Sequence, residues 1–165
     1  MAISDGLLKE FDHEMRNTRR TLERVPFDKA AWKPHHKSNS LGSLAEHLTV
    51  IPALAVPVLT AAELDVAAER GRHAPANSAK ELLEHFDRNV AAGRSALASL
   101  QDAESATPWT LKAGDQVLWT LPRLVAFRGF IMNHMVHHRA QLGVYLRLND
   151  VPVPGIYGPS ADEKV

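Results

Sequence analysis

Four long stretches of the chain repeat apolar residues at helical spacing, and clusters of proline, glycine and serine separate them. An apolar stripe along one side of a helix has to be buried against another element. The first stretch runs roughly from Ser4 to Val25, and the last from near Pro122 to about Asn149. Because four such helices can bury their stripes against one another, the pattern predicts an all-α chain that folds as a four-helix bundle.

The two middle helices carry recognisable start signals. The second opens within "SNSLGSLAEHL", where Ser40 or Ser43 can cap the first backbone amides and Ser43 with Glu46 fits a capping box. Pro52 and Pro57 each remove an amide donor from this helix, so we expect it to bend. Ser78 caps the third helix. The segment "PFDKAAWKPHHKSNS", between the first and second helices, predicts a short helical turn followed by a polar loop.

The connection before the last helix has a different pattern. Two short runs of β-prone residues, Trp109 to Leu111 and Gln116 to Thr120, flank a Gly-Asp turn. They predict a small hairpin or an irregular crossover. A connection of this length also leaves room for a bundle topology other than simple up-down.

Length and charge exclude several classes of protein. The 165 residues fit one domain, residues 1–165, and the 19 basic and 19 acidic residues balance. A neutral chain lacks the basic surface that nucleic-acid binding requires. The absence of cysteine excludes disulfides and Cys-based zinc sites. The charged amino terminus and the lack of eighteen consecutive apolar residues predict no targeting peptide, no membrane span and a cytoplasmic location.

Histidines fall on the apolar side of two helices. In "NHMVHHRAQLGVYLRL", residues 133–148, His134 and His138 are one turn apart. At one hundred degrees per residue they fall in the middle of the apolar stripe of the last helix. His47 is likewise central in the stripe of the second helix. Three imidazole rings are therefore expected to point inward from two helices.

Two interpretations of these rings are open. Each could be a separate core histidine with its own hydrogen bond. However, three buried rings without partners would cost about 1–3 kcal/mol each, whereas one divalent ion satisfies all three. His134 and His138 have a spacing at which two rings can close on one ion, although Met135 breaks the zincin pattern. Imidazole suits Zn, Ni, Fe or Cu, and three ligands leave a coordination position open, as in catalytic sites.

Several segments together resemble the DinB/YfiT-like superfamily. The matching pieces are "LGSLAEHL" with His47, "NHMVHHRAQLGVYLR" with His134 and His138, the Trp-containing crossover, and the ending "VPVPGIYGPSADE". The likeness covers nearly the whole chain. It implies an up-down-down-up four-helix bundle in which the three histidines bind one divalent ion, often nickel or zinc. It further implies a thiol-dependent transferase or isomerase and a homodimer, as in several members.

Three functions remain open at this point. The first is a metal-dependent transferase whose ion activates a low-molecular-weight thiol, and the second is a metal-dependent hydrolase. Against the hydrolase, no inward Asp or Glu stands out as a general base. The third is a non-catalytic metal-binding stress protein. The expected partners are a small-molecule substrate and a second copy of the chain, without nucleic acid or membrane.

For the other polar and aromatic residues that stand out in the sequence, we expect packing or surface roles rather than roles as ligands. His137 leaves the stripe, so we expect it outside the ligand set, although it could substitute for a ligand or support one. Thr18 could face the site or bond to a helical carbonyl. For Arg128 and Arg139 we expect surface or interface salt bridges rather than a role in catalysis. The remaining expectations are a solvated His13, loop positions for His35, His36 and His73, His85 beside its helix's core face, and packing roles for Trp109 and Trp119.

The last helix also carries apolar residues away from its stripe, namely Phe130, Val136 and Val144. This additional surface has to be covered. Either the crossover packs on it, or a second copy of the chain does so about a two-fold axis.

Overall fold

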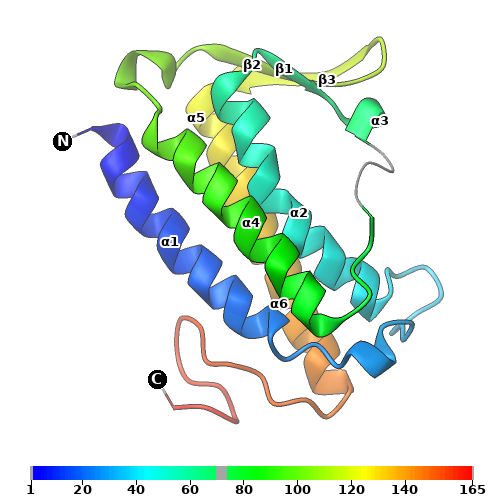
Figure 1. Ribbon diagram of the computed structural model, residues 1–165. Coiled ribbons are helices and arrows are strands. Elements are labelled where there is room, and N and C mark those ends of the chain that lie inside the picture. Colours follow the sequence, from blue (N-terminus) through cyan, green and yellow to red (C-terminus); the bar gives the residue numbers. More distant parts are fainter. Residues whose placement is uncertain (1, 70–73, 165) are drawn as a thin grey trace.

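Four long helical stretches lie side by side in the computed structural model, which describes residues 2–69 and 74–164 (Figure 1). α2 packs against α4 and α6, and α1 also contacts both of those helices. The first and last stretches run in one direction, and α2 and α4 run in the other (Figure 1). The stretches are α1 (Ile3–Leu22), α2 (Leu41–Thr60), α4 (Ala79–Ala98), and a final one made of α5 (Arg123–Ala126), a π-helical segment (Phe127–Asn133) and α6 (His134–Leu148).

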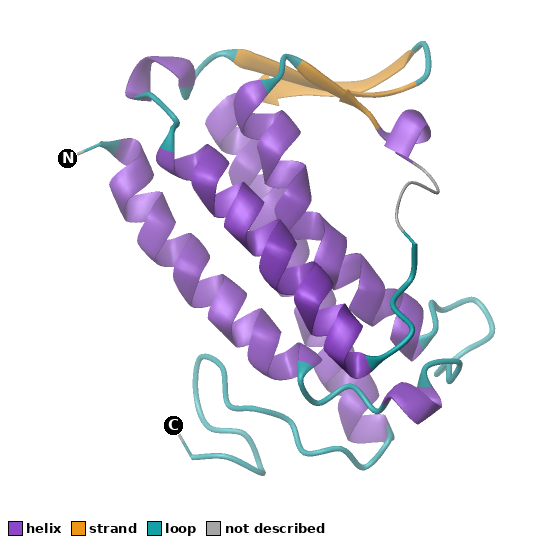
Figure 2. Ribbon diagram, viewed as in Figure 1, coloured by secondary structure: helices purple, strands orange, loops and turns teal. Residues whose placement is uncertain are grey.

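A small sheet lies across one end of the helices (Figure 2), so the all-α prediction is correct only in part. The predicted hairpin is present as β2 (Pro108–Ala113) and β3 (Gln116–Pro122), which pair antiparallel. β1 (Glu63–Asp65) adds a parallel partner to β2 and is followed by α3 (Val66–Glu69). Because β1 and α3 have three and four residues, neither is long enough to show a periodic pattern.

α2 begins where the sequence predicts and continues through both of its prolines. The Ser40 hydroxyl accepts from the Ser43 amide at 3.1 Å. Gly93 of α4 lies against it: a Cβ there would be 2.4 Å from the carbonyl oxygen of Pro52, so the close approach requires glycine. By length and composition alone α2 could cross a membrane, but half of that stretch is buried here, and core helices pass the same test.

The last helical stretch contains an irregularity that moves its apolar stripe. Its π-helical segment widens the helix, and π-helical turns are typical of functional sites. One buried residue in each turn forms the stripe, and its five turns take nineteen residue steps where an ideal α-helix would use about eighteen. These residues are Phe127, Ile131, Met135, Arg139, Leu142 and Leu146, with Ala126 and Met132 buried beside them.

This additional residue corrects the predicted placement of the histidines. His134 and His138 are half-buried at the edge of the core rather than in the middle of the apolar face. His47 is also half-buried at an edge, because Leu44 and Leu48 of α2 face the interior. The rings are therefore accessible from outside.

Two different segments lie against the additional apolar residues of the last helix and cover them in part. The hairpin packs on Phe130, whose ring lies 6.0 Å from that of buried Trp109 and 5.8 Å from that of Trp119. Val136 and Val144 line a cavity of about 370 Å³ together with residues of the C-terminal tail. The predicted crossover cover is thus present at Phe130, while Val144 remains 59% exposed.

The two arginines expected in salt bridges differ. Arg128 pairs with Glu10 at the surface, as predicted. Arg139 also makes a salt bridge, with Glu14 of α1, but it is only 3% exposed and therefore lies in the interior between helices rather than at the surface. The added residue of the π-helical segment brings Arg139 into the stripe that faces α1.

Candidate metal centre

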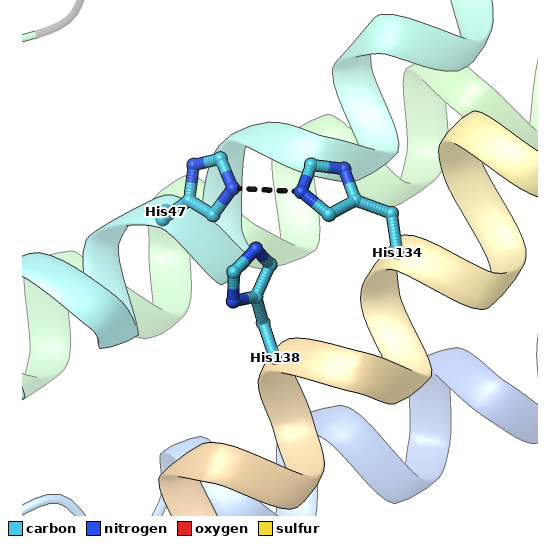
Figure 3. A group of neighbouring side chains, drawn as sticks. All are labelled: His47, His134 and His138. Atoms are coloured by element: carbon cyan, nitrogen blue, oxygen red, sulfur yellow. Dashed lines mark hydrogen bonds between the residues drawn. The ribbon is translucent and has the colours of Figure 1, made fainter.

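Three imidazole rings converge between α2 and α6 (Figure 3). A hydrogen bond of 3.1 Å joins the Nε2 atoms of His47 and His134, and the centroid of the His138 ring lies 4.6 Å from the centroids of both other rings. One nitrogen of each ring lies within 4.8 Å of the other two. Two nitrogens bound to a tetrahedral ion at about 2.0–2.1 Å are themselves about 3.4 Å apart, so the rings fit one ion.

The outer nitrogens of two rings have acceptors that fix their protons. His138 Nδ1 lies 2.7 Å from Oε1 of Gln141, and His134 Nδ1 lies 3.3 Å from the carbonyl oxygen of Phe130. Because both oxygens accept, each Nδ1 carries the proton and each Nε2 keeps its lone pair. Metal-binding histidines are commonly oriented by outer hydrogen bonds of this kind. Gln141 follows His138 by three residues, so helical spacing could have indicated it.

The environment lowers the pKa of two of the rings, His47 and His134. Burial, followed by the neighbouring His134 and His138, lowers the pKa of His47 to about 4. Burial also lowers the pKa of His134, and His138 contributes in the same direction. Since a metal ligand must be unprotonated, these shifts leave the lone pairs available for an ion.

The surroundings of the three rings differ on two sides. On one side, Phe130 stacks on His134 with the ring centroids 5.9 Å apart, and Trp119 stands edge-on to Phe130. On the other side, a pocket of about 530 Å³ runs over α2, and both Glu46 and His47 line it. The sequence indicated Glu46 only as the partner of Ser43 in a capping box; Ser40 caps α2 instead, and Glu46 lines this pocket. A small molecule can reach the site through this pocket.

His137, His13 and Thr18 lie outside the group of three histidines. His137 is exposed; its ring neighbours that of His138 but it does not join the group of three. His13 is exposed and lies 3.0 Å from the Asn17 amide. Thr18 donates to the carbonyl of Glu14 at 2.9 Å, which is the helical back-bond.

The other histidines are placed as expected where the structure describes them. His35 and His36 are exposed in the loop before α2. His85 is half-buried on α4, with Nδ1 3.5 Å from Glu46. The prediction for His73 lies outside the described residues.

Comparisons with known proteins agree with this architecture. The model of the DinB family matches residues 2–164. A DinB-like protein from Bacillus cereus ATCC 10987 has a TM-score of 0.73 and 22% identity, over 94% of this chain and 98% of that one. The DinB-like protein YjoA from Bacillus subtilis has a TM-score of 0.70 and 17% identity, over 92% and 96%.

A member of the DinB family from Exiguobacterium sibiricum 255-15, described as putative, has a TM-score of 0.66 and 17% identity, over 94% and 97% of the two chains. At these identities the likeness shows a shared fold. A search among curated proteins gave no match.

Proposed function

Because the chain belongs to the DinB family, we propose that it is a metal-dependent transferase that activates a low-molecular-weight thiol. In this proposal His47, His134 and His138 bind one divalent transition-metal ion within an up-down-down-up four-helix bundle. The observation that carries it is the convergence of three ring nitrogens, two of them on rings oriented from outside by Gln141 and the Phe130 carbonyl.

The donor set favours nickel or zinc, with iron as a further choice. Within the described residues the group contains imidazoles and no carboxylate. Calcium and magnesium prefer oxygen ligands, whereas imidazole suits zinc, nickel, copper and iron. Three ligands leave a position at which a substrate can bind, as in catalytic zinc sites.

In such a site the groups around the three histidines have different roles. A bound divalent ion supplies Lewis acidity, which lowers the pKa of a thiol or water that reaches it. Gln141 and the Phe130 carbonyl hold two rings in orientation. Phe130 and Trp119 exclude water on one side, while the pocket along α2 admits a small molecule on the other.

Metal analysis of the purified protein, followed by a transfer assay with several small thiols, tests the proposal. We expect one ion per chain in the wild type and a sharp loss in His47→Ala, His134→Ala and His138→Ala. His13→Ala is the matched control, because His13 is exposed on α1 and outside the group. Equal metal content in the wild type and the triple alanine variant would overturn the proposal.

A metal-dependent hydrolase is the second candidate. The observation that favours it is Glu46, a carboxylate that lines the same pocket as His47 and could accept a proton from water. The two candidates differ in their need for a thiol. Turnover of an electrophile without thiol, lost in Glu46→Gln, would favour the hydrolase.

We also propose a homodimer that uses the exposed side of α6. Val144 and Leu148 are 59% and 57% exposed there. Most soluble homo-oligomers bury such surfaces about a two-fold axis. Light scattering should give twice the mass of the chain at micromolar concentration, and Val144→Asp should reduce it to that of the monomer. A monomeric wild type would contradict this proposal.

A further inference from the structure

The pocket that reaches the histidine cluster is formed over one side of α2. Ser43, Glu46, His47 and Val50 recur at the spacing of one helix face. Phe27 and Ala30 close one wall, and Pro75 and Ala76, which precede α4, close the opposite wall. A molecule whose reactive atom reaches the ion beside His47 therefore extends along Glu46.

Glu46 has unusual surroundings for a surface glutamate. Its side chain is only 20% exposed, and it accepts from the Ala76 amide at 3.3 Å. Its other neighbour is His85, at 3.5 Å. Within the described residues Glu46 makes no ion pair with Lys or Arg, although Arg88 lines an adjacent cavity. Other acidic side chains of the helices, namely Glu10, Asp12 and Asp87, pair with arginine.

The carboxylate has acceptor capacity beyond these two contacts. An ionised carboxylate offers about four lone-pair sites, and a partly desolvated charge without a cationic partner is unfavourable. An ammonium group on a ligand would donate to the free lone pairs of the carboxylate and would supply the cationic partner that Glu46 lacks, in a charge-assisted hydrogen bond. An anionic ligand group at the same place would be repelled.

We propose that Glu46 is the docking carboxylate for a positively charged amino group on the thiol substrate. The inference rests on the proposed function, since it takes the sulfur of that thiol to the ion beside His47. On binding, the thiol proton passes to solvent and the sulfur coordinates as the thiolate. The substrate class is thus an aminothiol. The spacing of its amine and its sulfur has to match the separation between the Glu46 carboxylate and an ion beside His47.

Titration of metal-loaded protein with matched thiols tests the inference. The probes are cysteamine, 2-mercaptoethanol and 3-mercaptopropionate, which differ mainly in a cationic, neutral or anionic end group. Binding is followed by the thiolate-to-metal absorption of the nickel or cobalt form. We expect cysteamine to bind about tenfold more tightly than 2-mercaptoethanol, and 3-mercaptopropionate to bind most weakly. Longer aminothiols then show which distance between the amine and the sulfur gives the tightest binding.

The deciding variant is Glu46→Gln, which keeps an acceptor for the Ala76 amide. It should retain full metal content and bind the cationic and neutral thiols equally. Glu81→Gln is the matched control, because Glu81 also lies near His85, at 3.8 Å, but is not among the residues lining the pocket; it should keep the wild-type order.

An unchanged order of affinities in Glu46→Gln, or no preference for the aminothiols in the wild type, would overturn the inference while leaving the metal site intact. Metal content is measured before any thiol is added. A wild type that takes up no metal would therefore identify failure of the proposed function itself, and the inference would fail with it.

Discussion

His138 and Arg139 are consecutive residues of α6, yet they belong to two polar clusters of opposite kinds. Arg139 donates to the Glu14 carbonyl at 3.0 Å and to the Thr18 hydroxyl at 3.2 Å, and it pairs with the Glu14 carboxylate at 2.7 Å. Tyr157 completes this cluster by donating to the same carboxylate at 2.7 Å. Its donors and acceptors therefore match.

The histidine cluster, by contrast, has one hydrogen bond among its own rings, between His47 and His134. Two of its rings have their protons directed outward, to Gln141 and to the Phe130 carbonyl. A cluster whose donors and acceptors match holds elements together, whereas ring nitrogens that converge in this way are suited to bind a cation. The contrast separates a polar cluster that stabilises the fold from one that we propose binds an ion.

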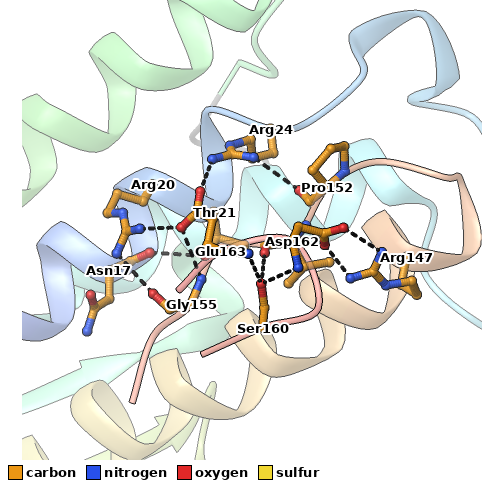
Figure 4. A network of polar contacts seen from close by, with 11 residues as sticks. Asn17, Arg20, Thr21, Arg24, Arg147, Pro152, Gly155, Ser160, Asp162 and Glu163 are labelled. Atoms are coloured by element: carbon orange, nitrogen blue, oxygen red, sulfur yellow. Dashed lines mark hydrogen bonds and ion pairs between the residues drawn. The ribbon is translucent and has the colours of Figure 1, made fainter. Parts of the chain in front are cut away.

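The first cluster also holds the C-terminal tail. Tyr157 belongs to that tail, which ion pairs tie to the helices (Figure 4). Glu163 pairs with Arg20 and Arg24 of α1, and Asp162 pairs with Arg147 of α6. The tail therefore joins the first and last helices without contributing to the group of three histidines.

Arg139→Met should have the largest effect, because it leaves Glu14 as a buried charge without its partner. We expect a loss of about 3–5 kcal/mol in the free energy of unfolding, measured by urea titration. The matched control is Arg128→Met, since Arg128 pairs with Glu10 of the same helix α1 but at the surface. That control should cost less than about 1 kcal/mol. Similar losses in both variants would contradict a structural role specific to Arg139.

Metal removal should have the next largest effect. An ion that binds α2 and α6 of the folded chain stabilises it by about 2.7 kcal/mol when free metal exceeds the Kd a hundredfold. This corresponds to roughly 5–11 °C in Tm for a chain of this size. We expect a chelator to remove this gain in the wild type and to have no effect on His138→Ala. A wild-type Tm unaffected by chelator would show that the cluster binds no ion.

The two clusters were not equally predictable from the sequence. His47, His134 and His138 were selected because their helical spacing placed them on inward faces, and the structure brings the three rings together; their role as ligands stays a prediction. The caps Ser40 and Ser78 and the hairpin were also identified, because turn and cap residues act locally. Such features depend on neighbours within a few positions.

Features that depend on distant partners were missed. Arg139 meets Glu14 across 125 positions of the chain, and no local pattern links them. The π-helical segment adds one residue to the stripe, which moves the histidines to the edge of the core and Arg139 into it. The pocket depends on the packing of the segment around Ala76 over α2, so the capping-box spacing of Glu46 gave no indication that this side chain lines a pocket.

Gln141→Ala removes the hydrogen-bond acceptor of His138 Nδ1 and leaves the three histidines themselves in place. Without the acceptor, the His138 ring is free to turn and its proton can move to Nε2. We expect metal affinity to fall about 10- to 100-fold, measured by competition with a chromogenic chelator. Gln141→Glu, which keeps an acceptor, should restore most of it. Unfolding of the metal-free protein should be unchanged, because Gln141 is exposed.

The smallest expected effect is the pH dependence of the metal-free protein, and its sign distinguishes the two clusters. The pKa of His47 is about 4 in the folded chain and about 6.5 when unfolded. Between these values the unfolded state binds more protons, so stability falls as pH decreases from about 6.5 and is constant above 7. After discounting for partial exposure, we expect a loss of about 1 kcal/mol by pH 5.

This window lies above the range in which the ion-paired carboxylates of the tail titrate, because Asp162 and Glu163 have lowered pKa values. His47→Gln should therefore give a flatter stability curve between pH 7 and pH 5, whereas Glu163→Gln should keep the wild-type slope there. Urea unfolding at several pH values measures both. If the His47→Gln curve kept the wild-type slope, protonation of this ring would not be what opposes folding in acid, and the cluster would tolerate charge as the Arg139 cluster does.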